Sequence, residues 1–155
     1  MNDPACVVDI AGSATFTAAS YDNAAGYYTA GLMTVGGDFA APNDGRSTSM
    51  FQASGTHTVR LTGASAQVSF ADATNSYFRR LEIASGAAVT FMTNVRTLED
   101  LECSGSLTTS LGTTTTVSGA LRLLAGAVLD DQGVITAASC NKSPQATVTG
   151  TDPCP

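Results

Sequence analysis

Residues 81–123, LEIASGAAVTFMTNVRTLEDLECSGSLTTSLGTTTTVSGALRL, carry three copies of one short motif: apolar, charged, apolar. The copies are Leu81-Glu82-Ile83, Leu101-Glu102-Cys103 and Leu121-Arg122-Leu123, and they begin 20 positions apart. A fixed period of about this length is a signature of a solenoid, in which each coil of the chain stacks on the one before it. We therefore predict that Leu81, Leu101 and Leu121 form a core stack with Ile83, Cys103 and Leu123, and that the charged residues point outward.

Two further sets of positions follow the same grid: Val95, Thr115 and Ile135, and Val89, Thr109 and Leu129. Apolar and polar residues alternate along these segments, and no window shows the i, i+3, i+4 spacing of a helix. The prediction is an all-β fold, a single-stranded right-handed parallel β-helix with coils of about 20 residues. A β-sandwich or jelly roll is the alternative for a chain of short strands, but it gives no reason for a fixed interval.

The chain is predicted to be one domain over residues 1–155. Residues 5–139 would form coils with loop insertions near 20–31, 40–50 and 71–77, and residues 140–155 a C-terminal tail. Four cysteines allow three pairings, and a disulfide between Cys140 and Cys154 would tie the tail to the body. Cys103 occupies the position of Ile83 in the repeat, which favours a buried thiol over a bridge to Cys6. A disulfide implies an oxidising, extracellular compartment.

Composition argues against several classes of function. The net charge is −6, and the arginines are scattered along the sequence. Binding to a phosphate backbone needs clustered cations, so we expect no nucleic-acid partner. No run of about 18 apolar residues occurs, so no insertion into a membrane is expected. Charged residues make up only 13% of the chain, which is common in secreted β-rich proteins.

Residues 31–124 resemble secreted bacterial β-helix repeat proteins, which occur as adhesin-like stalk modules on cell surfaces. The resemblance rests on three segments: GLMTVGGDF at 31–39, SGTHTVRLTG at 54–63 and FRRLEI at 78–83. It implies an elongated structural role and a location outside the cell or on its surface. It implies no catalytic residues.

The tyrosines lie between the predicted repeat strands rather than within them. Tyr27, Tyr28 and Tyr77 are the candidate binding residues, because aromatic rings in loops can stack on sugars, and Tyr21 lies in the same insertion as the first two. Alternatively, these rings cover an open end of the solenoid. His57 is the only histidine, and we expect it to be an ordinary surface residue.

Carboxylates offer two further hypotheses. Parallel β-helix enzymes that degrade polysaccharides use paired carboxylates, and Glu82 and Glu102 would stand about 4.8 Å apart on stacked strands. The adjacent pairs Glu99-Asp100 and Asp130-Asp131 are other candidates. We expect no cofactor, although a structural calcium ion would find oxygen ligands at Asp22-Asn23, Asn43-Asp44, Asp72 with Asn75, or Asp130-Asp131.

The sequence thus favours a non-enzymatic, extracellular structural or adhesin-type module of a bacterial surface protein. The alternatives are a carbohydrate-binding module that uses the tyrosines, a polysaccharide-degrading β-helix enzyme, and a filament subunit that self-associates end to end. The expected partners are a surface glycan or another protein.

Overall fold

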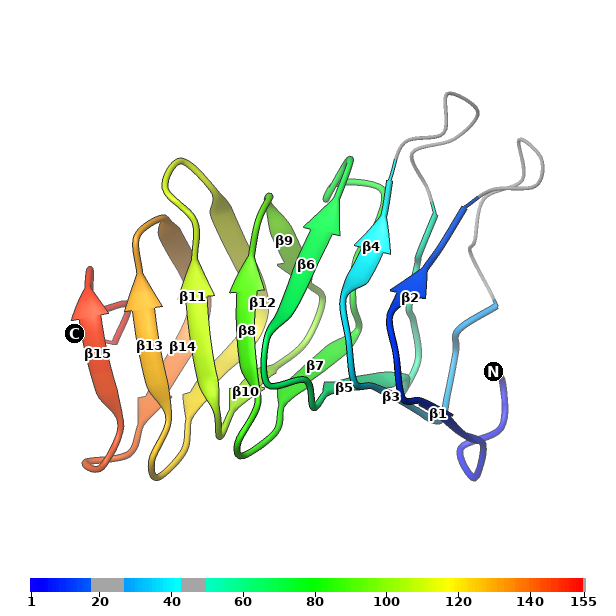
Figure 1. The fold of residues 1–155 in the computed structure, drawn as a ribbon, viewed down its shortest axis with the longest axis horizontal. Helices are drawn as coiled ribbons and strands as arrows, with labels where there is room; N and C mark the ends of the chain where they lie inside the picture. Colours follow the sequence, from blue (N-terminus) through cyan, green and yellow to red (C-terminus); the bar gives the residue numbers. More distant parts are fainter. Residues whose placement is uncertain (18–26, 43–49, 155) are drawn as a thin grey trace.

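The computed structural model describes residues 1–17, 27–42 and 50–154, in which parallel strands are joined by turns and loops; none of the described residues is helical (Figure 1). One sheet contains β1 (Val7–Ile10), β3 (Leu32–Val35), β5 (Thr58–Leu61), β7 (Arg80–Ile83), β10 (Leu101–Cys103), β12 (Thr114–Leu123) and β14 (Val134–Lys142), with β9 (Val95–Thr97) paired to β12. The other contains β2 (Ala14–Thr15), β4 (Phe39–Ala41), β6 (Ala66–Phe70), β8 (Ala88–Phe91), β11 (Ser106–Thr109), β13 (Val128–Asp131) and β15 (Thr147–Gly150).

The chain winds as a right-handed solenoid with three sides. The seven-stranded sheet forms the second side and lies in front in Figure 1, with β2 toward the right and β15 at the left. Its strands run upward in this view as the chain advances from right to left. The first side contains β1, β3, β5, β7, β10 and the later halves of β12 and β14. The third side contains β9, the earlier halves of β12 and β14, and isolated bridges in the preceding coils. The predicted all-β solenoid is therefore confirmed.

The repeated motif forms two buried columns on the first side. Leu101 pairs with Leu81 in one neighbouring coil and with Leu121 in the other, and all three are fully buried. Ile83, Cys103 and Leu123 form the parallel column. The first column as a whole consists of Val8, Met33, Val59, Leu81, Leu101, Leu121 and Cys140.

The second side departs from the predicted grid. Leu107, and not Thr109, pairs with both Val89 and Leu129. Thr109 instead lies beside Asp131, and both side chains are buried in the core. The grid through Val95, Thr115 and Ile135 on the third side matches the observed register.

Turn length explains this shift. Residues 84–87 connect β7 to β8, and residues 124–127 connect β12 to β13, but only Ser104 and Gly105 connect β10 to β11. Gly105 permits the shorter turn, because a Cβ atom there would lie 2.4 Å from the carbonyl oxygen of Ala84. The strand β11 therefore begins two residues early relative to its neighbours.

The coils are longer at the N-terminal end. Val7 pairs with Leu32 and Leu32 with Thr58, at separations of 25 and 26 positions, and Thr58 pairs with Arg80 at 22. The later steps on this side are 20, 20 and 19 positions. The predicted insertions near 20–31 and 40–50 lie largely outside the described residues, whereas the one at 71–77 is described.

Phenylalanine fills the interior of these longer coils. Phe39 contacts Phe51 and Phe78, with ring centroids 4.9 and 4.8 Å apart, and all three are fully buried. Phe16 and Phe70 pack against the same cluster.

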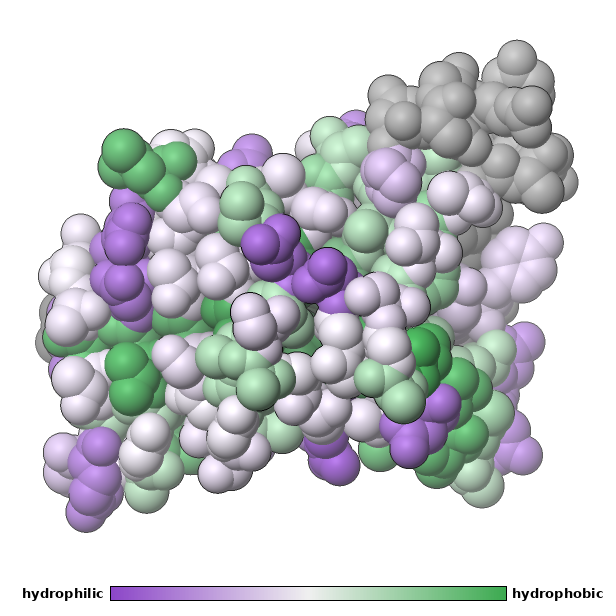
Figure 2. Space-filling view, viewed as in Figure 1, coloured by the Kyte–Doolittle hydropathy of each residue, from purple (hydrophilic) through white to green (hydrophobic). Residues whose placement is uncertain are grey.

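The outer face of the second side presents mainly residues of intermediate hydropathy to solvent (Figure 2), as the low content of charged residues predicts.

The C-terminal tail is attached to the last coil. Cys140 and Cys154 form the predicted disulfide, with Cα atoms 5.1 Å apart, within the usual range for such bonds. Lys142 forms an ion pair with Asp152, two residues before Cys154. Cys6 and Cys103 are free thiols, so the alternative bridge between them is absent. Burial raises the pKa of the Cys103 thiol to about 11.

The Leu101→Ala substitution tests the stacking. It removes a fully buried side chain from the middle of the first column, and we expect a loss of about 2–5 kcal/mol in the free energy of unfolding. Denaturant unfolding measures this loss. Glu102→Ala, one residue away on the outer face, is the control and should cost less than about 0.5 kcal/mol. Equal losses in the two variants would contradict the assigned register.

Candidate functional site

The third side carries a continuous row of outward-pointing residues. Tyr28 bridges to Ala53, which places Tyr27 beside Gln52, and Gln52 in turn bridges to Tyr77. Phe78 bridges to Thr97, which places Tyr77 beside Arg96. The ladder then continues from Arg96 to Thr116 and on to Thr136. We call Tyr27, Gln52, Tyr77, Arg96, Thr116 and Thr136 the outer row.

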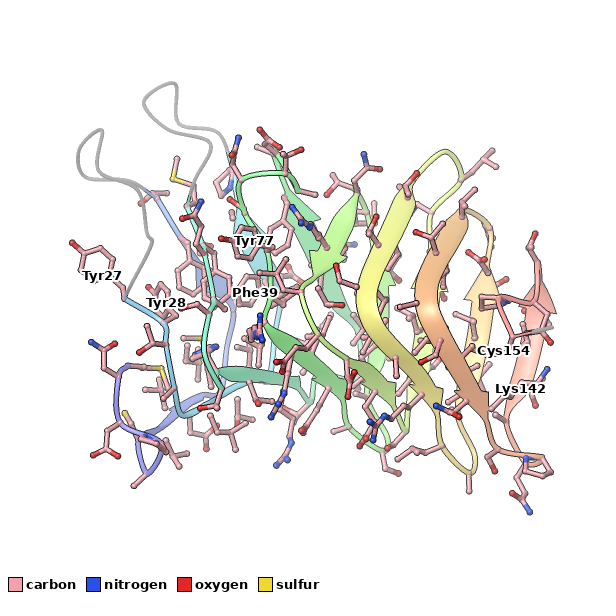
Figure 3. The ribbon with its side chains drawn as sticks, turned by 180° about the vertical axis from the view of Figure 1, so that it is seen from behind. Tyr27, Tyr28, Phe39, Tyr77, Lys142 and Cys154 are labelled. Atoms are coloured by element: carbon pink, nitrogen blue, oxygen red, sulfur yellow. A yellow bond between two sulfur atoms is a disulfide. The ribbon has the colours of Figure 1, made fainter. Side chains whose placement is uncertain are left out.

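The three candidate tyrosines separate into two environments (Figure 3). Tyr27 is 61% exposed and Tyr77 is half-buried, and both belong to the outer row. Tyr28 points the other way, and its ring lies 4.8 Å from that of Phe51 and 5.8 Å from that of Phe16. Burial raises the pKa of Tyr28. Tyr28 is therefore partly buried against the core, and Tyr27 and Tyr77 are the two candidate tyrosines that belong to the outer row. Tyr21 lies outside the described residues.

A hollow lies beside the outer row. Two adjoining concavities of about 360 and 410 Å³ share Ala73, Thr74 and Asn94, and we call them together the groove. Arg96 and Thr116 of the outer row line the first concavity, and Asp72 lines the second. Ligand sites commonly have volumes of about 300–1,000 Å³. The groove is polar and open rather than enclosed.

The loop at 71–77 forms one wall of the groove and is held by its own hydrogen bonds. The carboxylate of Asp72 accepts hydrogen bonds from the Thr74 amide and the Asn75 side chain, both at 2.8 Å. The bond from the Thr74 amide is the main reason why the pKa of Asp72 is lowered. The side chain of Gln52 donates to the carbonyl oxygen of Asn75 at 2.9 Å, which joins the loop to the outer row.

Every described arginine and lysine except one forms an ion pair. The pairs are Arg60 with Glu82, Arg79 and Arg80 with Glu99, Arg122 with Asp100, and Lys142 with Asp152. Arg96 has no carboxylate partner among the described residues. Its guanidinium carbon lies 5.7 Å from the centre of the Tyr77 ring, a cation–π contact. The sequence did not predict the contact of Arg96 with Tyr77 or the ion pairs, because residues that are far apart in the sequence become neighbours only when the coils stack.

Of the carboxylates proposed for catalysis, Glu82 and Glu102 lie side by side, whereas Asp130 and Asp131 lie on another side of the solenoid. Glu82 and Glu102 are register partners on the first side, and Glu82 accepts a hydrogen bond from Arg60 at 2.7 Å. Asp131 lies on the second side and points into the core, where it accepts a hydrogen bond from Thr109 at 2.5 Å. Its neighbour Asp130 points outward and accepts from Gln132 and Thr149. Glu82, Asp130 and Asp131 thus each accept a hydrogen bond from a neighbouring side chain.

The described parts of the chain contain no cluster of acidic side chains that could hold a calcium ion. No group of three or more His, Cys, Asp or Glu side chains lies there in an arrangement that could hold a metal ion. At the sites that the sequence suggested, Asp72 closes a turn and Asp130 and Asp131 point to opposite sides. Asp22-Asn23 and Asn43-Asp44 lie outside the described residues.

His57 is a correction to the sequence analysis, because it is fully buried. In a strand, residues i and i+2 point to the same face, so His57 points inward with Val59 and Leu61. Its ring lies 5.7 Å from Tyr28 and 5.9 Å from Phe51, and neither ring nitrogen has a hydrogen-bond partner. Burial disfavours the imidazolium form and lowers the pKa of His57 to about 4.

Comparison of the chain with protein-family models, with curated proteins and with solved structures found no match. Among the described residues, no helix is long and apolar enough to cross a membrane. The fold itself assigns the chain to the β-solenoid class of proteins.

We predict that acid destabilises the protein through His57. The pKa of this group is about 4 in the folded state and about 6.5 when unfolded, so the unfolded state takes up the proton first as pH falls. The resulting loss should build up between pH 6.5 and 4 and reach about 3 kcal/mol. Denaturant unfolding at pH 7.5 and 4.5 measures it.

His57→Phe is the comparison variant, because it keeps an aromatic ring among aromatic neighbours and removes the titrating group. Carboxylates contribute to the pH dependence of both proteins and cancel in the difference. The variant should therefore lose less stability between the two pH values. An identical pH dependence in both proteins would contradict the assignment.

Proposed function

We propose that this protein is a non-enzymatic, extracellular structural or adhesin-type module of a bacterial surface protein, and that its third side contacts an extended glycan. The outer row is the observation that carries this proposal. It runs along the solenoid axis and presents Tyr27 and Tyr77 on the same side, with polar side chains between and beyond them.

The spacing of the outer row suits a linear polymer. Stacked strands are about 4.8 Å apart, so the two tyrosines, which are two coils apart, stand about 9.6 Å from each other along the axis. Aromatic faces can stack on sugar rings, while amides and hydroxyls form hydrogen bonds to the sugar hydroxyls. Gln52 lies between the two rings, and Arg96, Thr116 and Thr136 extend the surface beyond Tyr77.

Two other properties support the extracellular part of the proposal. The disulfide between Cys140 and Cys154 is typical of an oxidising compartment. The stacked coils give a rigid body suited to a spacer or stalk, as in the secreted bacterial repeat proteins that the sequence resembles. The catalytic alternative would rest on the register partners Glu82 and Glu102, but Glu82 is already paired with Arg60, and Asp131 is buried on another side of the solenoid.

Tyr27→Ala combined with Tyr77→Ala tests glycan contact. A glycan array should identify ligands for the unmodified protein, and the double variant should bind them at least about 10-fold more weakly. The scale is that of a nucleic-acid base stacked on an aromatic side chain, which contributes about 1–3 kcal/mol per ring. Calorimetry on the best ligand quantifies the loss. Val128→Ala, which shortens an exposed apolar side chain on the second side, is the control and should bind normally. Absence of any glycan ligand would end the proposal.

End-to-end association is a second candidate function. Within the described residues, β1 and β2 each pair with one strand only, and Val7 beside this edge is 65% exposed. Unpaired strand edges can pair with a second chain, whereas the disulfide-linked tail is attached to the opposite end. We expect the apparent mass in static light scattering to rise with protein concentration. A constant monomer mass across a wide concentration range would contradict this.

A further inference from the structure

Arg96 differs from the other arginines and the lysine of the described residues, because its side chain forms no ion pair. Every other arginine and lysine of the described residues has a carboxylate partner, in a chain whose net charge is −6. Carboxylates outnumber the cations, so the lack of a partner for Arg96 does not reflect a shortage of them. The side chain is half-buried, lines the groove, and rests on the ring of Tyr77.

The carboxylates that follow Arg96 most closely in the sequence are paired with other arginines. Arg79 and Arg80 share the single carboxylate of Glu99, three residues after Arg96, and the Nε atom of Arg79 is buried without a hydrogen-bond partner. The adjacent Asp100 is already paired with Arg122. Glu99 and Asp100 are thus engaged by other arginines and do not pair with Arg96.

The rest of the groove supplies neutral polar groups. Asn94, Thr114, Thr116 and Ser118 line the same concavity as Arg96. The one carboxylate in the lining is Asp72, which belongs to the adjoining concavity, and it already accepts hydrogen bonds from Thr74 and Asn75. An anionic group beside Arg96 would thus meet a guanidinium and hydroxyl groups rather than an opposing carboxylate.

We infer that the groove and the outer row bind an acidic saccharide, with Arg96 paired to a carboxylate or sulfate group and Tyr77 stacked on an adjacent sugar ring. A guanidinium presents a planar set of donors that matches such oxyanions in a bidentate manner. Its contact with Tyr77 holds it in place over the ring. This inference rests on the proposed glycan contact of the third side and specifies the charge of the ligand.

The test uses the intact protein and three matched sets of oligosaccharides: uronic-acid oligomers, the same oligomers with their carboxyl groups methyl-esterified, and sulfated oligomers. Binding is measured by calorimetry at low and at physiological salt. The acidic forms should bind more tightly than the esterified form, and their affinity should fall as salt rises. The comparison of uronate with sulfate identifies which oxyanion the site prefers.

Arg96→Gln is the central variant. Loss of a charge-assisted hydrogen bond should weaken acidic ligands about 10- to 100-fold and leave esterified ligands unchanged, whereas Tyr77→Ala should weaken both. Arg96→Lys keeps the charge but not the planar donors, and an intermediate affinity is expected. Arg60→Gln is the control, because it removes the same charge from an ion pair on the first side. Thermal unfolding verifies that each variant is folded; the Arg96 side chain forms no hydrogen bond or ion pair with the described residues, and its backbone bonds remain in each variant.

The outcomes separate this inference from the proposed function. Equal binding of acidic and esterified oligomers, or an Arg96→Gln variant that binds acidic oligomers normally, would overturn the inference and leave glycan contact standing. No binding to any saccharide, acidic or neutral, would overturn both. An equal loss in Arg96→Gln and Arg60→Gln would show a general effect of net charge, and would also overturn the assignment of a site at Arg96.

Discussion

The structure depends on one constraint: each coil must place its inward side chains directly on those of the coil before it. Parallel strands about 4.8 Å apart leave no room for an intervening layer, so a column such as Leu81, Leu101 and Leu121 must hold residues of compatible size and polarity. The column stays apolar from Val8 to Leu121 and ends at Cys140, where the disulfide to Cys154 replaces the next coil. Hydrophobic burial and the backbone ladder therefore enforce the same register.

The two halves of the solenoid satisfy this constraint with different side chains. On the first side the C-terminal coils repeat after 19 or 20 residues, and Leu, Val, Cys and Thr fill their interior. On the first side the N-terminal coils repeat after 22 to 26 residues, and the phenylalanine cluster around Phe39 and Phe51 fills their interior. A ring spans more of the interior than an aliphatic side chain does. His57 is located in this half because its two aromatic neighbours, Tyr28 and Phe51, can accommodate a neutral imidazole.

Periodicity in the sequence was sufficient for the fold and insufficient for the site. The stack through Leu101 was predictable because its coils have nearly equal length, so fixed spacing in sequence translates into neighbours in space. Thr109 was misplaced because the short turn at Gly105 shifts one strand by two residues. The outer row was hidden for a related reason: Tyr27, Gln52 and Tyr77 are 25 positions apart, while Arg96, Thr116 and Thr136 follow at 19 and 20. The structure is needed to show that the residues spaced by 25 positions and those spaced by 19 or 20 form a single row along the solenoid.

Charge on the outer faces follows a rule, and its exception locates the candidate site. Arg60 pairs with Glu82, Arg79 with Glu99, and Arg122 with Asp100, so each pair links neighbouring coils. Single exposed pairs contribute little stability, but their regular use means that a cation on this solenoid normally stands beside an anion. Arg96 stands beside Tyr77 and Thr116 instead. Places where a sequence breaks its own structural pattern are where function is expected, because a side chain that the fold does not use remains available to a ligand.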